Sequence, residues 1–97
     1  MYEVLVSSSG QRALKKLPIS IRQTLFDEAR GLSKDPFLGK RLEGEFKHLY
    51  SLRVIHGGTH YRLIYQVNQD KKQVIVLFAG SRENLYRRLT QLKVRSQ

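Results

Sequence analysis

The chain has 97 residues and no cysteine, and 18 lysines and arginines against 8 aspartates and glutamates give it a formal charge of +10. This length suits a single domain over residues 1–97, and the missing cysteine excludes disulfides and thiolate metal sites. The longest apolar run, residues 74–79, is far shorter than the ~20 residues of a membrane span, and the N-terminus lacks signal-peptide features. We therefore expect a cytoplasmic protein with no membrane partner.

The first third of the chain predicts a strand followed by two helices. Residues 2–7 are rich in β-branched side chains and predict the strand, and residues 11–17 predict a short helix with a narrow apolar stripe. Apolar residues recur every three or four positions over residues 21–32, which predicts an amphipathic helix that ends before Pro36. Ser20 begins a stretch with the spacing of a capping box, so we expect it to start that helix.

The middle of the chain predicts a loop and then a β-hairpin. Residues 36–47 contain a proline and two glycines and predict the loop. Residues 49–67 form two alternating runs around a Gly-Gly pair, which predicts a two-residue turn because both positions need positive φ. This turn sets Arg53 directly opposite Arg62 on one face. The same register also brings the apolar residues of both strands together on the other face, so two independent signals agree.

The last third predicts a strand and a helix. Residues 73–80 are almost wholly apolar and predict a central strand, buried on both faces, that Gly80 and Ser81 terminate. Residues 82–93 have leucines at helical spacing and predict a terminal amphipathic helix capped by Ser81. The predicted fold class is α+β, with an N-terminal strand and helical hairpin packed on an antiparallel sheet that contains a three-strand meander, and a C-terminal helix.

The excess of basic residues lies mainly in the second part of the chain. Residues 1–38 have six basic and four acidic side chains, whereas residues 39–97 have twelve and four. This asymmetry fits a surface that binds a polyanion, one that docks an acidic protein, or only a soluble basic protein. We find no phosphate-binding loop, no metal-site spacing among the three histidines and no carboxylate pair suited to hydrolysis, so we expect no cofactor and no metal.

With these sites excluded, the remaining candidate for a functional site is a group of arginines. The hairpin pairs Arg53 with Arg62, Arg82 follows the apolar strand, and Tyr86 comes one helical turn later. Guanidinium groups match phosphate oxygens and stabilise charge that develops at phosphorus. A lone tyrosine more often serves packing, and a lone exposed arginine is usually only solvated. The opposed pair favours an anionic ligand, because like charges directly across two strands repel each other.

The runs LGKRLEGEF, LYSLRV, HYRLIYQV and VIVLFAGSRENLYR resemble the RelE/ParE superfamily of toxins from bacterial toxin–antitoxin modules, and most of all its RelE branch. The resemblance covers nearly the whole chain and implies a RelE-like fold. It implies a ribosome-dependent endoribonuclease that cuts mRNA in the A site by attack of the ribose 2′-OH, without a metal or other cofactor, and so inhibits translation. It also implies four kinds of partner, which are a cognate antitoxin, ribosomal RNA, mRNA and, through the antitoxin, promoter DNA.

The resemblance also implies roles for particular residues. Arg62 and Arg82 match the arginines that hold the phosphate and stabilise its transition state. Tyr86 matches a tyrosine associated with base stacking and proton transfer. Arg53 stands where some members have one lysine of a basic pair, and the position of the other lysine is Ser51 here. This departure removes a cation and leaves the identity of the proton acceptor open.

Other interpretations stay open at this point. His60 is predicted to share a face with Arg62 and is either a substitute general base or a residue near the turn without a role. Within the superfamily, the ParE branch inhibits DNA gyrase and is not a nuclease. A third possibility is a non-catalytic module that binds RNA or the antitoxin, and the serine at position 51 is compatible with it.

Overall fold

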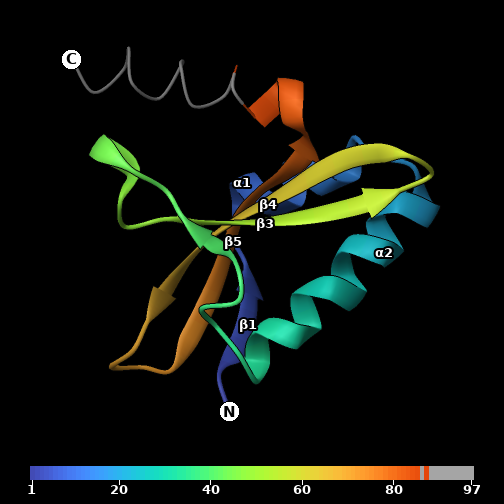
Figure 1. Ribbon diagram of the computed structural model, residues 1–97. Helices are drawn as coiled ribbons and strands as arrows, with labels where there is room; N and C mark the ends of the chain where they lie inside the picture. The colour runs from blue at the N-terminus through green and yellow to red at the C-terminus, as the bar shows by residue number, and fades with distance from the viewer. Residues whose placement is uncertain (86, 88–97) are drawn as a thin grey trace.

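The computed structural model describes residues 1–85 and 87. These residues form a mixed α+β fold (Figure 1). The elements follow in the order β1 (Glu3–Val6), α1 (Ser8–Lys15), α2 (Ile19–Arg30), η1 (Gly31–Ser33), β2 (Lys40–Arg41), η2 (Gly44–Phe46), β3 (Tyr50–His56), β4 (Thr59–Asn68) and β5 (Gln73–Ser81), where η marks a short 3-10 helix. Residues 82–85 are again helical, which places the start of a C-terminal helix where the leucine spacing predicted it.

Within the described residues the strands form one five-stranded sheet in the order β1-β5-β4-β3-β2. The predicted meander is confirmed, because β3, β4 and β5 are consecutive antiparallel neighbours. The N-terminal strand β1 joins this sheet at one edge, where it runs parallel to β5. Its direction follows from the crossing of α1 and α2 over the sheet before the chain returns, and nothing in the four residues of β1 itself specifies that direction.

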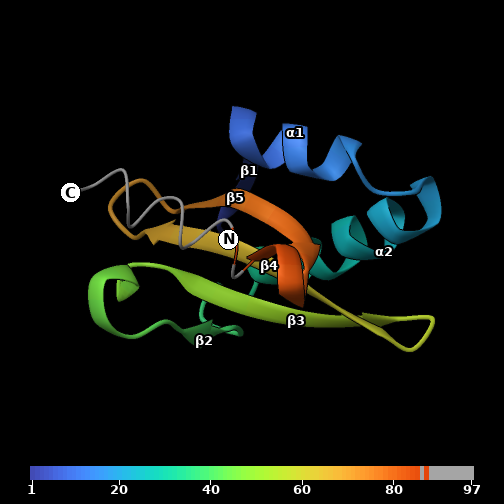
Figure 2. The same ribbon diagram turned by 90° about the horizontal axis from the view of Figure 1, so that it is seen from above.

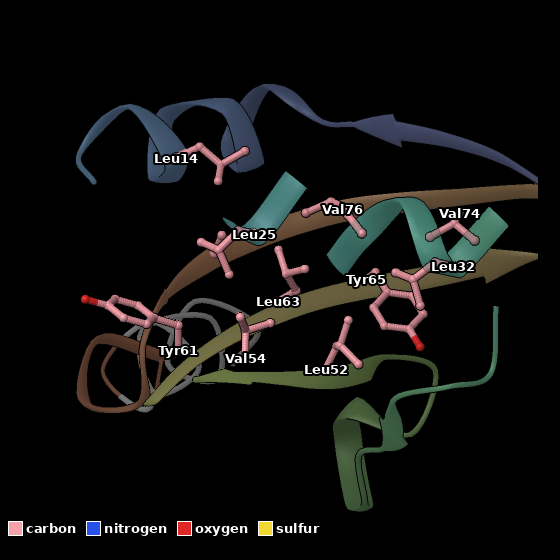
Figure 3. Packing of buried hydrophobic residues seen from close by; sticks show 12 residues of the cluster. Leu14, Leu25, Leu32, Leu52, Val54, Tyr61, Leu63, Tyr65, Val74 and Val76 are labelled. Atoms are coloured by element: carbon pink, nitrogen blue, oxygen red, sulfur yellow. The ribbon is translucent and has the colours of Figure 1, made fainter. Parts of the chain in front are cut away.

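Both helices cover the same face of the sheet, which we call the helix-covered face (Figure 2). Leucines of the two helices interdigitate with apolar residues of β3, β4 and β5 in one cluster (Figure 3). The buried members include Leu14, Leu25, Leu32, Leu52, Leu63, Tyr65, Val74 and Val76. This packing confirms that the apolar stripes of the helical hairpin are the cover of the sheet.

The first helix begins earlier than predicted, at Ser8. Ser7 is its N-cap, and the Ser7 Oγ accepts a hydrogen bond of 3.0 Å from the Gly10 N–H. A side chain at Gly10 would place its Cβ 2.6 Å from the Val76 carbonyl oxygen, so glycine is needed for α1 to approach β5 closely. The serine-rich stretch is therefore the capped start of the helix, because its hydroxyl replaces a missing backbone acceptor.

The second helix does not use the predicted capping box. It begins at Ile19, with Pro18 at the N-cap position and no side-chain hydrogen bond to the cap, so that Ser20 lies in the first turn. Proline is favoured at a helix start because its ring fixes φ near the required value and the start needs no donor. This helix also contacts the turn between β3 and β4, because Thr24 Oγ1 lies 3.0 Å from Nδ1 of His56, the last residue of β3.

The hairpin has the predicted register. Arg53 pairs with Arg62, and the turn residues Gly57 and Gly58 have φ values of 58° and 79°. Apolar residues of both strands face the helices, whereas Ser51, Arg53 and Ile55 of β3 and His60, Arg62 and Ile64 of β4 lie on the opposite side, which we call the open face. Turn chemistry and hydrophobic alternation are both local signals, which is why they sufficed here.

The apolar strand β5 is an interior strand of the sheet, as predicted, because it lies between β1 and β4. It differs from its prediction in one way, since it continues through Ser81 and is not broken at Gly80. A bulge interrupts its pairing with β4, since Tyr65 pairs with Val76 but the preceding Ile64 pairs with Phe78. The inserted residue shifts the alternation, so both faces of β5 receive apolar side chains, with the open-face side only half-buried.

The open face is not bare. A second cluster on it consists of buried Leu49, Ile64 and Leu85, with Leu42, Phe46, Leu77 and Phe78 packed around them. This cluster explains why the predicted loop over residues 36–47 is ordered, since the loop contains β2 and η2 and packs Leu42 and Phe46 here. Among the described residues, the structure contains no helix of the length and apolarity that crossing a membrane requires.

Candidate active site

The centre of the candidate site is a row of three residues across neighbouring strands. Arg53 of β3 pairs with Arg62 of β4, and Arg62 pairs with Gly80 of β5. Directly paired residues present their side chains on the same side of a sheet, so both arginines lie on the open face. Arg53 is exposed and Arg62 is half-buried. Two guanidinium groups therefore share one patch, and no side chain occupies the third place of the row.

Arg82 enters the same region from the end of β5. Ser81 pairs with Tyr61, and the Ser81 Oγ accepts a hydrogen bond of 3.3 Å from the Asn84 N–H, as expected for the predicted helix cap. Leu85 holds this turn against the open-face cluster. Arg82 is thus two residues along the chain from Gly80, the partner of Arg62.

Tyr86, the remaining residue expected at the site, lies outside the described residues. His60 is two residues before Arg62 on the open face, pairs with Ile55, and is exposed. Ser51 is half-buried on the same face and pairs with Ile64 on one side. The predicted positions of His60 and Ser51 on the sheet are therefore correct, and their chemical roles stay predictions.

A further cation lies on this face that the sequence analysis did not identify. On its other side Ser51 pairs with Lys40 of β2, and Lys40 is exposed. A strand of only two residues has no alternation to detect, so Lys40 was expected in a loop. The glycine before it, Gly39, has no side chain and so allows the backbone to approach β3 closely.

The electrostatic character of the patch is strongly positive. The two ion pairs between described residues join Asp27 to Arg30 and Glu83 to Arg87. In this part of the chain no carboxylate neutralises Lys40, Arg53 or Arg62. Cations that share a face in this way attract and orient anions, and the guanidinium forks in particular fit phosphate oxygens. No group of three histidine or acidic side chains among the same residues is placed to hold a metal ion.

Gly80 shapes the floor of the site. A Cβ there would lie 2.9 Å from Cζ of the Phe78 ring, so the glycine leaves room for this ring beside Arg62. Gly80 also lines a pocket of about 350 Å³ that α1 and the end of β5 border together with Asn84 and Arg87, and Arg12 and Lys16 add positive charge there. These basic residues of α1 extend the positive charge to the end of β5. This extension could be found only once α1 was placed.

A buried tyrosine, Tyr65, fixes the backbone next to Lys40 at the edge of the sheet. The hydroxyl of Tyr65 accepts a hydrogen bond of 2.9 Å from the Gly39 N–H, next to Lys40. Its ring stacks on Tyr50, with centroids 5.5 Å apart and planes inclined by 17°. Burial raises the pKa of Tyr65, although the hydrogen bond from Gly39 acts in the opposite direction. The neutral phenol therefore fixes the position of β2 relative to β3 and β4.

Known proteins resemble this chain in sequence and in fold. A family model described as "ParE-like toxin of type II bacterial toxin-antitoxin system" matches residues 4–90. The toxin RelG of Mycobacterium tuberculosis is 35% identical over 89 residues, which are 90% of this chain and 98% of that protein. In the crystal structure of the toxin–antitoxin complex RelBE2, also from Mycobacterium tuberculosis, one chain is 32% identical, with a TM-score of 0.74 over 84% of this chain and 98% of its own.

More distant structures share the fold alone. The isolated E. coli RelE toxin has a TM-score of 0.71 at 23% identity, over 94% of this chain and 97% of its own. The match to residues 4–90 includes Arg53, Arg62 and Arg82 and extends over the sheet except for Glu3 at the start of β1. Sequence, fold and family match agree, and the chain belongs to the RelE/ParE superfamily of toxins from type II bacterial toxin–antitoxin systems.

Proposed function

We propose that this toxin is an endoribonuclease that cuts mRNA in the A site of the ribosome and thereby inhibits translation. The observation that carries the proposal is the pairing of Arg53 with Arg62 on the open face, with Arg82 two residues after Gly80, which is the partner of Arg62 on β5. Like charges placed directly opposite each other destabilise a strand pair by ~0.2–1 kcal/mol. An RNA phosphate bound between them reverses that repulsion.

The proposed reaction is an internal transfer at one phosphodiester. The ribose 2′ oxygen attacks the adjacent phosphorus, a bond from phosphorus to that oxygen forms, and the bond to the 5′ oxygen of the next nucleotide breaks. The 2′ proton goes to a base and the departing 5′ oxygen takes up a proton, which leaves a 2′,3′-cyclic phosphate and a 5′-hydroxyl. Arg62 and Arg82 hold the non-bridging oxygens, whose negative charge increases in the transition state. Arg53 and the half-buried Ser51 bind the substrate beside them.

Two side chains are proposed to handle the base and the protons. Tyr86 is assigned to base stacking and proton transfer by the resemblance to the RelE branch. His60, on the open face beside Arg62, is the imidazole nearest along the strand and is proposed as a candidate acceptor of the 2′ proton. Replacement of His60 by glutamine distinguishes this role from that of a bystander, because only a proton acceptor changes the pH dependence of cleavage.

The proposed partners follow from charge and from the relatives. Relatives from Mycobacterium tuberculosis and E. coli were solved as toxin–antitoxin complexes, which supports a cognate antitoxin for this chain. The antitoxin would also connect the toxin to promoter DNA. Ribosomal RNA and mRNA are the proposed polyanions for the basic surface. Their binding should weaken as salt rises, because each neutralised phosphate releases counterions.

The test is to map new mRNA ends in a translation extract after addition of the protein. We expect cuts in phase with codons for the wild-type protein and a loss of at least about 100-fold in cleavage rate for Arg62→Ala, the effect typical of a lost transition-state donor. Arg30→Ala is the matched control, because Arg30 is an exposed arginine on α2 and should retain the wild-type rate within about twofold. Circular dichroism establishes that both variants are folded.

The same extract addresses two other functions. The matching family is described as ParE-like, so inhibition of DNA gyrase is the second candidate. Intact messages together with a loss of DNA supercoiling would identify a gyrase inhibitor. A folded protein that affects neither mRNA nor supercoiling would be a non-catalytic module that binds RNA or antitoxin. Full cleavage by folded Arg62→Ala would contradict the proposed site.

A further inference from the structure

We propose that Lys40, on the short edge strand β2, binds the RNA backbone beside the scissile phosphate and supplies the cation that position 51 lacks. The proposal rests on the nuclease function above and extends its site to a fourth strand. Lys40 is the direct cross-strand partner of Ser51. The Lys40 side chain therefore projects on the open face. Its strand, β2, is two strands from Arg62, whereas Arg53 is on the strand next to Arg62.

Packing fixes the direction of the Lys40 side chain independently of the strand pairing. Leu42, two residues later, packs against the open-face cluster of Leu49 and Ile64, and its N–H donates to the Leu49 carbonyl oxygen at 2.9 Å. Side chains two residues apart in an extended chain point to the same side. Lys40 and Leu42 therefore share the open face, whereas Arg41 between them points the other way.

The backbone around Lys40 is held closely against β3. A Cβ at Gly39 would lie 2.7 Å from the Tyr65 hydroxyl oxygen and 2.9 Å from the Ser51 carbonyl oxygen. The Gly39 N–H donates to that hydroxyl, and Arg41 Nε donates to the Lys47 carbonyl oxygen at 2.5 Å. These contacts on both sides of Lys40 place its Cα while its side chain stays in solvent. The charge is thus positioned by the fold and is open to a ligand.

The geometry suits a contact to a phosphate next to the reacting one. Lys40 is the diagonal neighbour of Arg53, and diagonal neighbours on a sheet face lie about 7–8 Å apart, within reach of long side chains. Among the described residues Lys40 has no carboxylate partner. A lysine presents a compact point charge on a flexible stem, so it accommodates a phosphate without a required fork geometry. Positioning of the RNA strand is the role that this arrangement predicts.

The experiment compares Lys40→Gln with Lys71→Gln, an exposed lysine in the turn after β4 that serves as the control. We expect Lys40→Gln to lower kcat/KM for cleavage in the translation extract about 10-fold, the lower end for a lost hydrogen bond to a charged group. Adding Ser51→Lys to Lys40→Gln should restore most of this loss, because it returns a cation to the facing position. Lys71→Gln should change cleavage less than about twofold.

Binding of a 2′-O-methyl RNA oligonucleotide provides a readout that a merely structural effect would not change. The methyl group blocks the attacking oxygen, so affinity is measured without cleavage. For Lys40→Gln the slope of log affinity against log salt should fall in magnitude by about 0.7, as for one phosphate contact on a single strand. The slope of Lys71→Gln should equal that of the wild-type protein.

The outcomes separate this inference from the proposed function. Equal cleavage by Lys40→Gln and Lys71→Gln, or equal salt slopes, would overturn the role of Lys40 while Arg62→Ala still reports on the nuclease. A loss of cleavage that Ser51→Lys does not restore would also overturn it, because the loss would then arise from β2 and not from charge. If the wild-type protein cuts no message, the proposed function itself fails.

Discussion

Tyr65 is a buried side chain of the helix-covered face whose hydroxyl holds β2 at the edge of the sheet. It is the largest fully buried residue among those described, and its ring contributes to the cluster under the helices. Its hydroxyl lies at the edge of that cluster and holds the Gly39 N–H. Removal of the hydroxyl would leave this donor without its partner at the start of β2. The polar contact and the apolar packing of one residue therefore have separable consequences.

We expect Tyr65→Phe to lower the free energy of unfolding by about 1–3 kcal/mol, because a backbone donor loses its acceptor while the ring is kept. Chemical denaturation at neutral pH measures this loss. Tyr50→Phe is the matched control, since it keeps the stacked pair of rings and removes a hydroxyl that makes no hydrogen bond to any of the residues that the structure describes. Equal stability of the two variants would contradict the role of the Tyr65 hydroxyl.

The same pair of variants has a signature in pH. Burial raises the pKa of folded Tyr65 above the ordinary value of 10.0, so the folded state holds this proton more tightly than the unfolded state. The corresponding stability is fully present below pH 10 and is lost as pH rises through the folded pKa. Wild-type protein and Tyr50→Phe should both lose stability in this range. Tyr65→Phe should show a flatter dependence, because it lacks the group that titrates.

At the scale of elements, the hairpin of β3 and β4 determines how the arginines meet. The turn residues Gly57 and Gly58 both have positive φ, and nothing lies within 4 Å of a Cβ at either position. Only the backbone conformation, and no steric contact, requires glycine there. A change at the turn therefore tests the conformation alone. The register of β3 and β4, and hence the face on which each side chain lies, depends on this turn. A strained residue in the turn would therefore disturb the pairing of Arg53 with Arg62.

Gly58→Ala should destabilise the protein by about 1–2 kcal/mol, because an L-residue is strained at this φ of 79°. Gly31→Ala is the comparison, since Gly31 ends α2 with a φ of −62° and also has open space around its Cβ. There alanine should stabilise by about 0.4–1 kcal/mol through the unfolded chain. Thermal unfolding of the two single variants gives the result, and shifts of the same sign would contradict this account.

At the scale of the whole molecule, the sheet carries a hydrophobic cluster on each face. The larger cluster lies between the sheet and the helices α1 and α2 and holds the fold together (Figure 3). The smaller one, on the open face, is surrounded by the basic side chains and packs β2, β3, β4, β5 and Leu85 against one another. The two clusters therefore have different relations to function, although both contribute to stability. The difference can be measured with two equally buried leucines.

Leu85→Ala and Leu14→Ala should destabilise the protein by similar amounts, about 2–5 kcal/mol, because the two side chains are 5% and 4% exposed. Only Leu85→Ala should reduce cleavage per folded molecule, by 10-fold or more, since Leu85 anchors the turn that begins with Arg82. The rates are compared under conditions where circular dichroism shows both variants folded. An equal loss of activity in both would mean that the open-face cluster has no special link to the site.

Much of this fold follows from signals that lie close together in the chain. The glycine turn, the alternation of β3 and β4 and the helical periodicities each involve residues within a few positions of one another. Those signals predicted the hairpin register and hence the shared face of Arg53 and Arg62, and they predicted Ser81 as a helix cap. They also predicted the meander and the apolar faces of the helices that cover it.

The amino-acid sequence by itself determined the elements, the register of the central hairpin and the excess of positive charge. Only the tertiary structure decided the parallel pairing of β1 with β5, the bulge between Val76 and Phe78, the ordering of β2 and the place of Lys40 opposite Ser51. The physical reason is that these features depend on contacts between residues distant in the chain. A two-residue strand or a four-residue edge strand has too few side chains to specify its partner, and packing against the rest of the sheet selects it.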